Sequence, residues 1–130
     1  MRPKKPILLY CADAGLLSTT AFALRLHPYE VTAVGNSTDA MLFAGDRDAE
    51  FACGIVIHAH QGDPAGRLIH RILAVTAHLP LLVVDRAGDL APVRYADMVL
   101  YGRNTSMAHI LAALCVLCRY KPGPKQRSAA

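Results

Sequence analysis

Two histidines follow a short apolar run in the stretch GIVIHAHQGD, residues 54–63. His58 and His60 lie on one side if an extended strand continues through them, because alternate residues of a strand share a face. With Asp13 or Asp85 nearby they could bind a transition metal. The alternative is that His58 is a partly buried imidazole bonded to a neighbouring loop and that His60 begins a solvated turn. We favour this alternative and predict no bound metal and no cofactor.

A cysteine and a histidine could also form a nucleophile–base pair, with Cys11 beside His58 or His60. The sequence supplies no evident group to orient the base and no oxyanion hole, so we predict no catalysis. Neither GxGxxG nor GxxxxGK[ST] is present to bind a nucleotide. Cys115 and Cys118 form a CxxC inside an apolar helical run, and without a second pair they indicate packing rather than a zinc site.

The composition indicates one compact domain. The chain has 130 residues, of which 53% are apolar and 18% charged, and this length suffices to bury a core. The four cysteines are too few, and too apolar in context, for a disulfide framework, so we expect reduced thiols. No segment reaches the roughly 18 uncharged apolar residues that cross a bilayer. We therefore expect a cytoplasmic protein without a membrane partner.

The formal net charge of +4 comes from the two ends of the chain. Residues 6–119 hold eight Lys and Arg against ten Asp and Glu, a net charge of −2. A mildly acidic body offers no nucleic-acid-binding face, so nucleic acid is not an expected partner. We expect residues 6–119 to form the domain and residues 120–130 to form a basic, flexible tail containing Pro and Gly.

Short apolar runs alternate with helical patterns along the chain. The runs predict strands at residues 6–12, 29–35, 51–59, 79–85 and 96–102. Helices are predicted at residues 14–27, 38–44, 65–78 and 105–119, with N-caps at Asp13, at Asn36 or Ser37, and at Asn104 or Thr105. Such alternation is typical of an α/β fold with a doubly wound, five-stranded parallel sheet. The helix between the fourth and fifth strands should be short or missing, because residues 86–95 leave room for little more than one turn.

These segments resemble a response-regulator receiver domain, the flavodoxin-like, CheY-like phosphoacceptor module of two-component signalling. ILLYCADAGLL resembles a first strand that usually reads like ILIVDDD, and YEVTAVGNSTDAM resembles the second strand and helix. GIVIHA, PLLVVD and ADMVLYG resemble the third, fourth and fifth strands. The resemblance covers nearly all of residues 6–119 and implies a flavodoxin-like fold and a place in a phosphorelay.

The resemblance also implies a set of positions that handle phosphate. In the family, a carboxylate after the third strand accepts the phosphoryl group, and an acidic pair after the first strand holds Mg²⁺. A Thr or Ser after the fourth strand and a Lys after the fifth bind the phosphoryl oxygens. The residues that match these positions here are Ala59 at the phosphoacceptor, Cys11 and Ala12 at the acidic pair with Asp13 beyond, Asp85 at the hydroxyl position and Gly102 at the Lys.

The substitutions at these positions are incompatible with phosphotransfer. Ala59 has no nucleophile, and Asp85 would add negative charge where phosphoryl oxygens must sit. Cys11 and Ala12 offer Mg²⁺ no hard oxygen ligand. We therefore predict a degenerate, stand-alone pseudo-receiver that is not an enzyme, is not phosphorylated by the usual aspartyl route and acts through a protein partner.

The last predicted helix, residues 105–119, leaves little polar surface except His109. A helix that is apolar all round indicates that a partner or a second copy of the chain covers its outer side. The alternative is that Ala-rich sides are tolerated in solvent. The candidate interface residues, which would also serve a homodimer, are Ile110, Leu111, Leu114 and Leu117.

A second hypothesis is a sensor for a small ligand or a metal. Ligands of doubly wound sheets bind beyond the carboxyl ends of the strands. A crevice that has lost its phosphate chemistry could hold another molecule there. The candidate crevice residues are His58, His60 and Arg103, with Asp13 and Asp85 also expected to line it.

Overall fold

The computed structural model describes residues 4–45, 51–60, 62, 64–75, 79–88, 96–103 and 105–119. The strands are β1 (Lys5–Cys11), β2 (Tyr29–Val34), β3 (Cys53–His58), β4 (Leu81–Asp85) and β5 (Met98–Tyr101). The helices are α1 (Ala14–Arg25), α2 (Ser37–Ala44), α3 (Ala65–Val75) and α4 (Met107–Arg119). All strand pairs are parallel, in the order β2-β1-β3-β4-β5. The predicted five-stranded α/β fold is confirmed.

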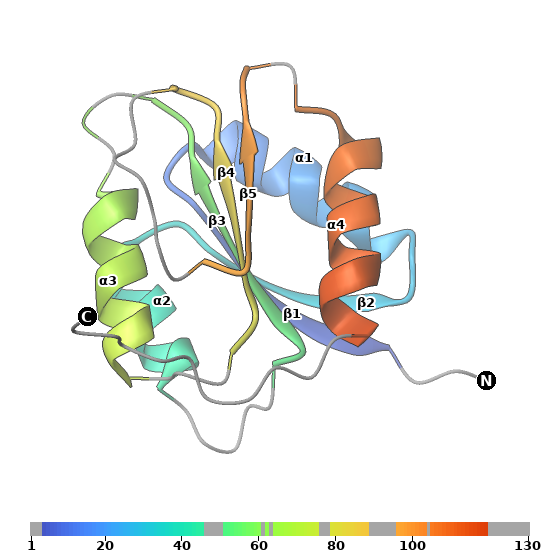
Figure 1. The fold of residues 1–130 in the computed structure, drawn as a ribbon, viewed down its shortest axis with the longest axis horizontal. Coiled ribbons are helices and arrows are strands. Elements are labelled where there is room, and N and C mark those ends of the chain that lie inside the picture. Colours follow the sequence, from blue (N-terminus) through green and yellow to red (C-terminus); the bar gives the residue numbers. More distant parts are fainter. Residues whose placement is uncertain are drawn as a thin grey trace.

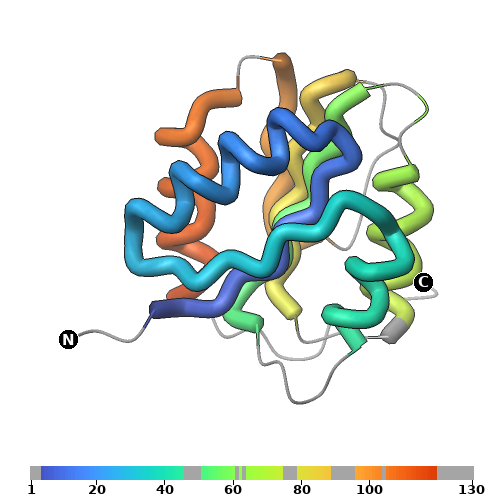
Figure 2. Tube along the Cα trace, turned by 180° about the vertical axis from the view of Figure 1, so that it is seen from behind, coloured from blue at the N-terminus to red at the C-terminus, as the bar shows by residue number. Residues whose placement is uncertain are grey.

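The sheet separates two layers of helices (Figure 1). Helices α1 and α4 cover one face, and α2 and α3 cover the other. The view from behind shows the same pairing, with α1 beside α4 and α2 beside α3 (Figure 2). The chain winds outward from β1 in both directions, so the connections that follow β1 and β3 leave toward opposite faces. Such a switch point is where ligands bind in open α/β sheets.

The central strands are apolar on both faces because both faces are covered. Every residue of β3 and β4 is buried. Alternate residues point to opposite sides, so Ile55 and Ile57 join the core under α1 and α4, whereas Val56 joins the core under α2 and α3. This explains why the strands read as continuous apolar runs rather than as alternating patterns.

The edge strand β5 is held to β4 at its start by Asp97. Its carboxylate Oδ2 accepts the amide of Leu81 at 2.7 Å, and its own amide donates to the carbonyl of Leu81 at 3.0 Å. Between β4 and β5, residues 86–88 and 96–97 are not helical. The prediction of a short or missing helix also concerns residues 89–95, which lie outside the described residues.

Two of the three predicted helix caps are confirmed. Asp13 accepts the amide of Leu16 at 3.0 Å, and Asn36 accepts the amide of Asp39 at 2.8 Å. The prediction for the last helix is wrong, because α4 begins at Met107 and is capped by Ser106.

The Oγ atom of Ser106 accepts the amide of His109 at 3.3 Å. The hydroxyl of Thr105 instead donates back to the carbonyl of Gly102 at 2.8 Å. Asn104 and the predicted tail, residues 120–130, lie outside the described residues. Within the part of the chain that the structure describes, no helix is long and apolar enough to span a membrane.

Candidate functional site

An open pocket of about 840 Å³ lies at the carboxyl edge of the sheet. This is the upper edge in Figure 1, toward which the arrowhead of β5 points. The lining comes from the first turns of α1 and from the segments after β1, β3, β4 and β5, and consists of Asp13, Gly15, Leu16, Thr19, Ala59, His60, Arg86, Ala87 and Arg103. The pocket therefore lies where the strand pattern predicts a ligand site.

Ala59, the residue at the phosphoacceptor position of the resemblance, lines this pocket directly after β3. The carbonyl of the preceding residue, His58, accepts the amides of Arg86 and Ala87 at 3.0 and 3.3 Å. These bonds tie the segment after β4 to the end of β3. The pocket is thus lined beside β3 by an alanine whose preceding carbonyl is bonded to the segment after β4.

The segment after β1 contributes one carboxylate to the pocket. Cys11 is buried in β1 and Ala12 is half-buried. Neither lines the pocket, so a nucleophile–base pair built on Cys11 has no place there. Asp13 is exposed and lines the pocket, but its Oδ1 already accepts the amide of Leu16. Its main visible role is to cap α1.

Asp85 lies in the core rather than in the pocket. Its side chain is only 1% exposed and is not among the lining residues. Oδ1 accepts the amide of Gly88 at 2.8 Å, and the Asp85 carbonyl accepts the amide of Gly102 at 2.9 Å. The expectation that this carboxylate lines the crevice is therefore wrong, because it turns inward to close the loop after β4.

The two histidines of the GIVIHAHQGD stretch do not share one surface. His58 is 5% exposed inside β3, opposite Asp85 in the register, whereas His60 is exposed and lines the pocket. His58 takes part in a polar interaction, although its Nδ1 atom is buried without a hydrogen bond among the described residues. In the same described residues, no three His, Cys, Asp or Glu side chains lie together as a metal site.

The pocket carries two arginines. Arg103 is exposed and follows Gly102, whose φ of +106° is a left-handed conformation that favours glycine. Arg86 is half-buried, and its Nη1 donates to the carbonyl of Thr105 at 3.3 Å. Sequence analysis named Arg103, but not Arg86, as a candidate crevice residue. The position of Arg86 directly after the fourth strand is the feature that could have identified it.

Three of the four candidate interface residues on α4 are part of the core. Ile110, Leu114 and Leu117 are buried and pack against the sheet, and Leu111 is half-buried against the same cluster. A partner cannot contact the three buried residues, so this assignment of residues is wrong. The residues that α4 exposes are Ala108, His109, Ala112, Cys115, Val116 and Arg119.

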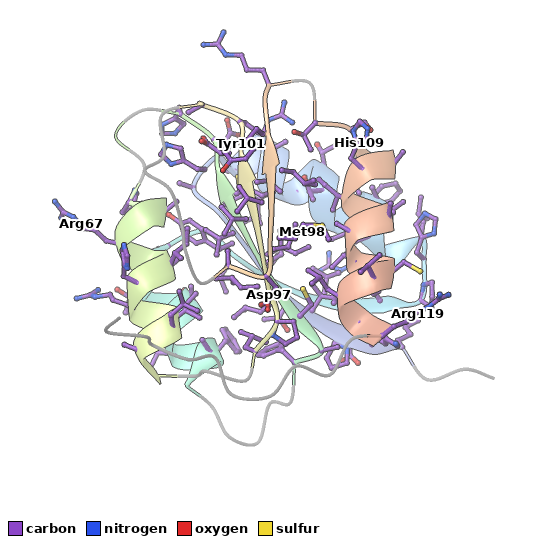
Figure 3. All side chains as sticks on the ribbon, viewed as in Figure 1. Arg67, Asp97, Met98, Tyr101, His109 and Arg119 are labelled. Carbon is purple, nitrogen blue, oxygen red and sulfur yellow. The ribbon has the colours of Figure 1, made fainter. Side chains whose placement is uncertain are left out.

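The exposed side of α4 carries mostly small, weakly polar side chains, and β5 ends in an exposed tyrosine. Val116 is 57% exposed and Tyr101, at the end of β5, is 68% exposed. In Figure 3, His109 and Arg119 mark the two ends of α4, and Tyr101 lies near the carboxyl edge of the sheet. We call Ala108, Ala112, Cys115 and Val116 the outer face of α4.

The two cysteines of α4 differ in environment. Cys115 is exposed, whereas burial raises the pKa of the half-buried Cys118 thiol and the nearby Lys5 ammonium opposes the rise. Lys5 also donates to the carbonyl of Cys118 at 3.2 Å. Burial, followed by the charge of neighbouring thiolates, raises the pKa of Tyr29 in the same region. All four cysteines of the chain are described, and no disulfide joins them.

No protein-family model matches this chain, and no curated protein matches it. Solved structures do. An adenylate cyclase from Rhodopirellula baltica is 20% identical with a TM-score of 0.76, over 89% of this chain and 88% of that one. A response regulator receiver domain protein from Clostridium thermocellum is 16% identical with a TM-score of 0.77, over 88% of this chain and 94% of that one.

A third similar structure belongs to a novel family of redox sensors in the streptococci that evolved from two-component response regulators. It is 18% identical with a TM-score of 0.72, and the match covers 88% of this chain and 51% of that one. At these identities the similarity concerns the fold. This chain therefore has the flavodoxin-like fold of response-regulator receiver domains.

Proposed function

We propose that this chain is a receiver-like signalling module that acts through protein–protein contacts and is not phosphorylated at the usual position. The observation that carries the proposal is Ala59. Its methyl group lines the pocket after β3, where the resemblance calls for an aspartate. A methyl group cannot attack a phosphoryl donor, so the step that switches a receiver has no nucleophile here.

The rest of the pocket supports the same proposal. Receiver-type phosphotransfer uses Mg²⁺, which prefers several hard oxygen ligands. Among the described lining residues Asp13 is the one acidic side chain, and it already caps α1. Asp85 is buried and turned toward Gly88. The charged groups that the structure describes in the lining are mostly cationic, and cationic groups disfavour Mg²⁺.

The contact surface in this proposal is the outer face of α4. These side chains are exposed, and the outer face offers a partner small apolar groups. A helix side of this kind buries well against another apolar surface. The partner in this proposal is a second copy of the chain or a different protein of a cytoplasmic signalling pathway. Because the outer face of α4 carries no charged side chain, either partner could meet it with an apolar surface.

Treatment with acetyl phosphate and Mg²⁺, followed by intact-mass measurement, tests the first half of the proposal. A receiver domain with an intact phosphoacceptor serves as the positive control and gains one phosphoryl group. We expect no phosphorylated product from this chain. A product on any carboxylate, mapped by peptide mass spectrometry, would contradict the proposal.

Sedimentation and affinity capture with surface variants test the second half. Val116→Glu places a charge on the outer face of α4, and Arg67→Glu places the same charge on an exposed position of α3. We expect Val116→Glu to reduce self-association or partner capture and Arg67→Glu to leave it unchanged. Equal behaviour of the two variants would exclude the outer face of α4 as the contact surface.

A second candidate function is that of a small-ligand sensor. The observation in its favour is the pocket of about 840 Å³, a volume within the range of about 300–1,000 Å³ that small-molecule sites occupy. The structure described as a redox sensor evolved from response regulators shows this fold in a sensing protein. A metal version of the sensor has little support, because the two histidines are separated and no three suitable side chains lie together among the described residues.

A further inference from the structure

We propose that the pocket beside Ala59 binds a small molecule through an oxyanion group, a phosphate ester or a carboxylate, held between Arg86 and Arg103. The inference deepens the second candidate function by naming the class of ligand. It does not depend on whether the outer face of α4 binds a partner. Its basis is the charge, the preorganisation and the shape of the pocket.

Among the described residues, the lining of the pocket carries more positive than negative charge. It includes Arg86 and Arg103 and, within that described part of the chain, one carboxylate, that of Asp13. Arginine stays protonated at every physiological pH, whereas the Asp13 carboxylate is partly occupied by the amide of Leu16. A guanidinium presents its donors as a planar fork that matches the oxygens of a carboxylate or a phosphate. The lining therefore attracts an oxyanion and repels a cation.

Arg86 is held in place before any ligand arrives. Its amide donates to the carbonyl of His58, and its Nη1 donates to the carbonyl of Thr105. Thr105 is itself fixed by the bond from its hydroxyl to the carbonyl of Gly102. A residue whose backbone and guanidinium are both hydrogen-bonded loses less conformational entropy on binding, so more of the interaction energy is available for affinity.

The floor of the pocket accommodates an anion because Ala59 adds no charge. A carboxylate at this position would repel a second negative group at short range. The first turn of α1 also faces the pocket through Gly15 and Leu16, and the amide end of a helix carries partial positive charge. The substitution that removes receiver chemistry is thus the one that makes room for an unlinked oxyanion.

Amide chemical shifts of the ¹⁵N-labelled full chain test the proposal. The probes are inorganic phosphate, glycerol 3-phosphate and succinate, each titrated at constant ionic strength against chloride. We expect saturable shifts concentrated at Gly15, Ala59 and Ala87. A response to the phosphates alone, to succinate alone, or to both supports an oxyanion site and identifies which ligand source it prefers. No saturable shift beyond that of chloride overturns the proposal.

Arginine variants supply the matched comparison. Arg103→Gln removes the charge of an exposed side chain and leaves the core untouched, and we expect the affinity for the responding probe to fall at least about tenfold. Arg86→Gln should give a similar loss. Arg67→Gln removes an equal charge from the exposed side of α3 and should leave the affinity unchanged. Equal losses of affinity in Arg103→Gln and Arg67→Gln would show that the probe is attracted only by the general charge of the protein, and would refute the site.

Two substitutions at Ala59 separate charge from shape. Ala59→Asp and Ala59→Asn add side chains of the same size, and only the first adds a negative charge. We expect the Asp variant to bind the responding probe at least about tenfold more weakly than the Asn variant. If both variants fold and bind the probe equally, the proposal is contradicted. If either Ala59 variant does not fold, the Arg103→Gln variant serves as the test instead. Phosphorylation by acetyl phosphate would instead contradict the proposed function, so the two failures are distinguishable.

Discussion

Helices α3 and α4 cover opposite faces of one sheet, and their inward sides are alike. Each buries a row of branched aliphatic side chains at helical spacing: Leu68, Ile69 and Ile72 on α3, and Ile110, Leu114 and Leu117 on α4. Either row can remove apolar surface from water by packing on the buried strands. In this respect neither helix is special.

The outward sides of the two helices differ. Helix α3 exposes Arg67, His70 and Arg71, and Figure 3 shows Arg67 extending away from the sheet. Helix α4 exposes its outer face of Ala108, Ala112, Cys115 and Val116, with polar groups at its two ends. A charged outer side is stable in water by itself, whereas an apolar one gains when it is covered. The fold therefore depends on the apolar inward sides, which the two helices share, and the proposed contact depends on the outward sides, in which they differ.

The largest effect should come from the shared inward rows. Leu114→Ala leaves a cavity under α4, and we expect the free energy of unfolding to fall by about 2–5 kcal/mol. Leu68→Ala under α3 should cost a similar amount. Urea unfolding followed by circular dichroism measures both. The exposed control Val116→Ala should change stability by less than about 0.5 kcal/mol. A small loss at Leu114 would mean that α4 is not part of the core.

The next effect should separate the outward sides. Val116→Lys adds a charge to the outer face of α4, and we expect self-association or partner binding to weaken about tenfold, since a charge must lose water to enter an apolar contact. Ala74→Lys makes a comparable change on the exposed side of α3 and should have no such effect. Sedimentation equilibrium over a range of concentrations gives both values. If the two lysines act alike, the contrast between the helices has no functional meaning.

A smaller effect should show how firmly α4 is anchored at its start. Ser106→Ala removes the oxygen that accepts the amide of His109, and we expect a loss of about 1 kcal/mol in the free energy of unfolding. The matched control is Ser18→Ala on the exposed side of α1. Chemical denaturation of both variants tests the assignment of the cap, and an equal change in the two would remove Ser106 from that role.

The smallest effect concerns the two cysteines of α4. Burial raises the pKa of Cys118 above its ordinary value of 9.0, so the folded state holds this proton more firmly than the unfolded state. The resulting contribution to stability is present below pH 9 and is lost as the pH rises through the folded pKa. We expect Cys118→Ala to reduce the decline of stability at alkaline pH, and Cys115→Ala to reduce it less, because the charge of Cys115 is a smaller cause of the raised Cys118 pKa than burial. Thermal melts between pH 7 and about pH 10 measure this difference.

The strands could be predicted from sequence because their apolar runs allow few other structures. The stretch from Cys53 to Ile57 is too short for a buried helix and too apolar for a loop. The same holds for α3, whose polar and apolar residues alternate with a clear helical phase. Leu68, Ile69, Ile72 and Leu73 recur at helical spacing, and all four are buried.

Helix α4 could not be oriented in the same way. Its sequence is apolar nearly all round, so the pattern carries no phase that says which side meets the sheet. Ile110, Leu114 and Leu117 were consequently assigned to the surface, although all three are buried. Neither size nor hydrophobicity alone identifies the inner side of this helix, because Ala113 is buried whereas the larger Val116 is exposed.

The residues of the pocket were only partly predictable. Ala59, His60 and Arg103 follow strands and do line it. Asp85 is the last residue of β4, and the hydrogen bond that its carboxylate accepts from the amide of Gly88 turns it inward. Such a choice depends on the geometry of one turn, which residue types alone do not specify. The same turn presents Arg86, rather than Asp85, to the pocket.

The bond from Arg86 to the carbonyl of Thr105 has a consequence for communication within the molecule. Thr105 stands just before the residue that caps α4, so one guanidinium contacts both the pocket and the approach to that helix. An anion bound to Arg86 shares this guanidinium with the carbonyl of Thr105, so its binding acts on the bond that helps to place the start of α4. Binding free energies are reciprocal, so a partner on α4 must alter the affinity for the anion by the factor by which the anion alters the affinity for the partner. Measuring the phosphate affinity with and without the partner would give this coupling directly, and equal affinities would show that the two sites are independent.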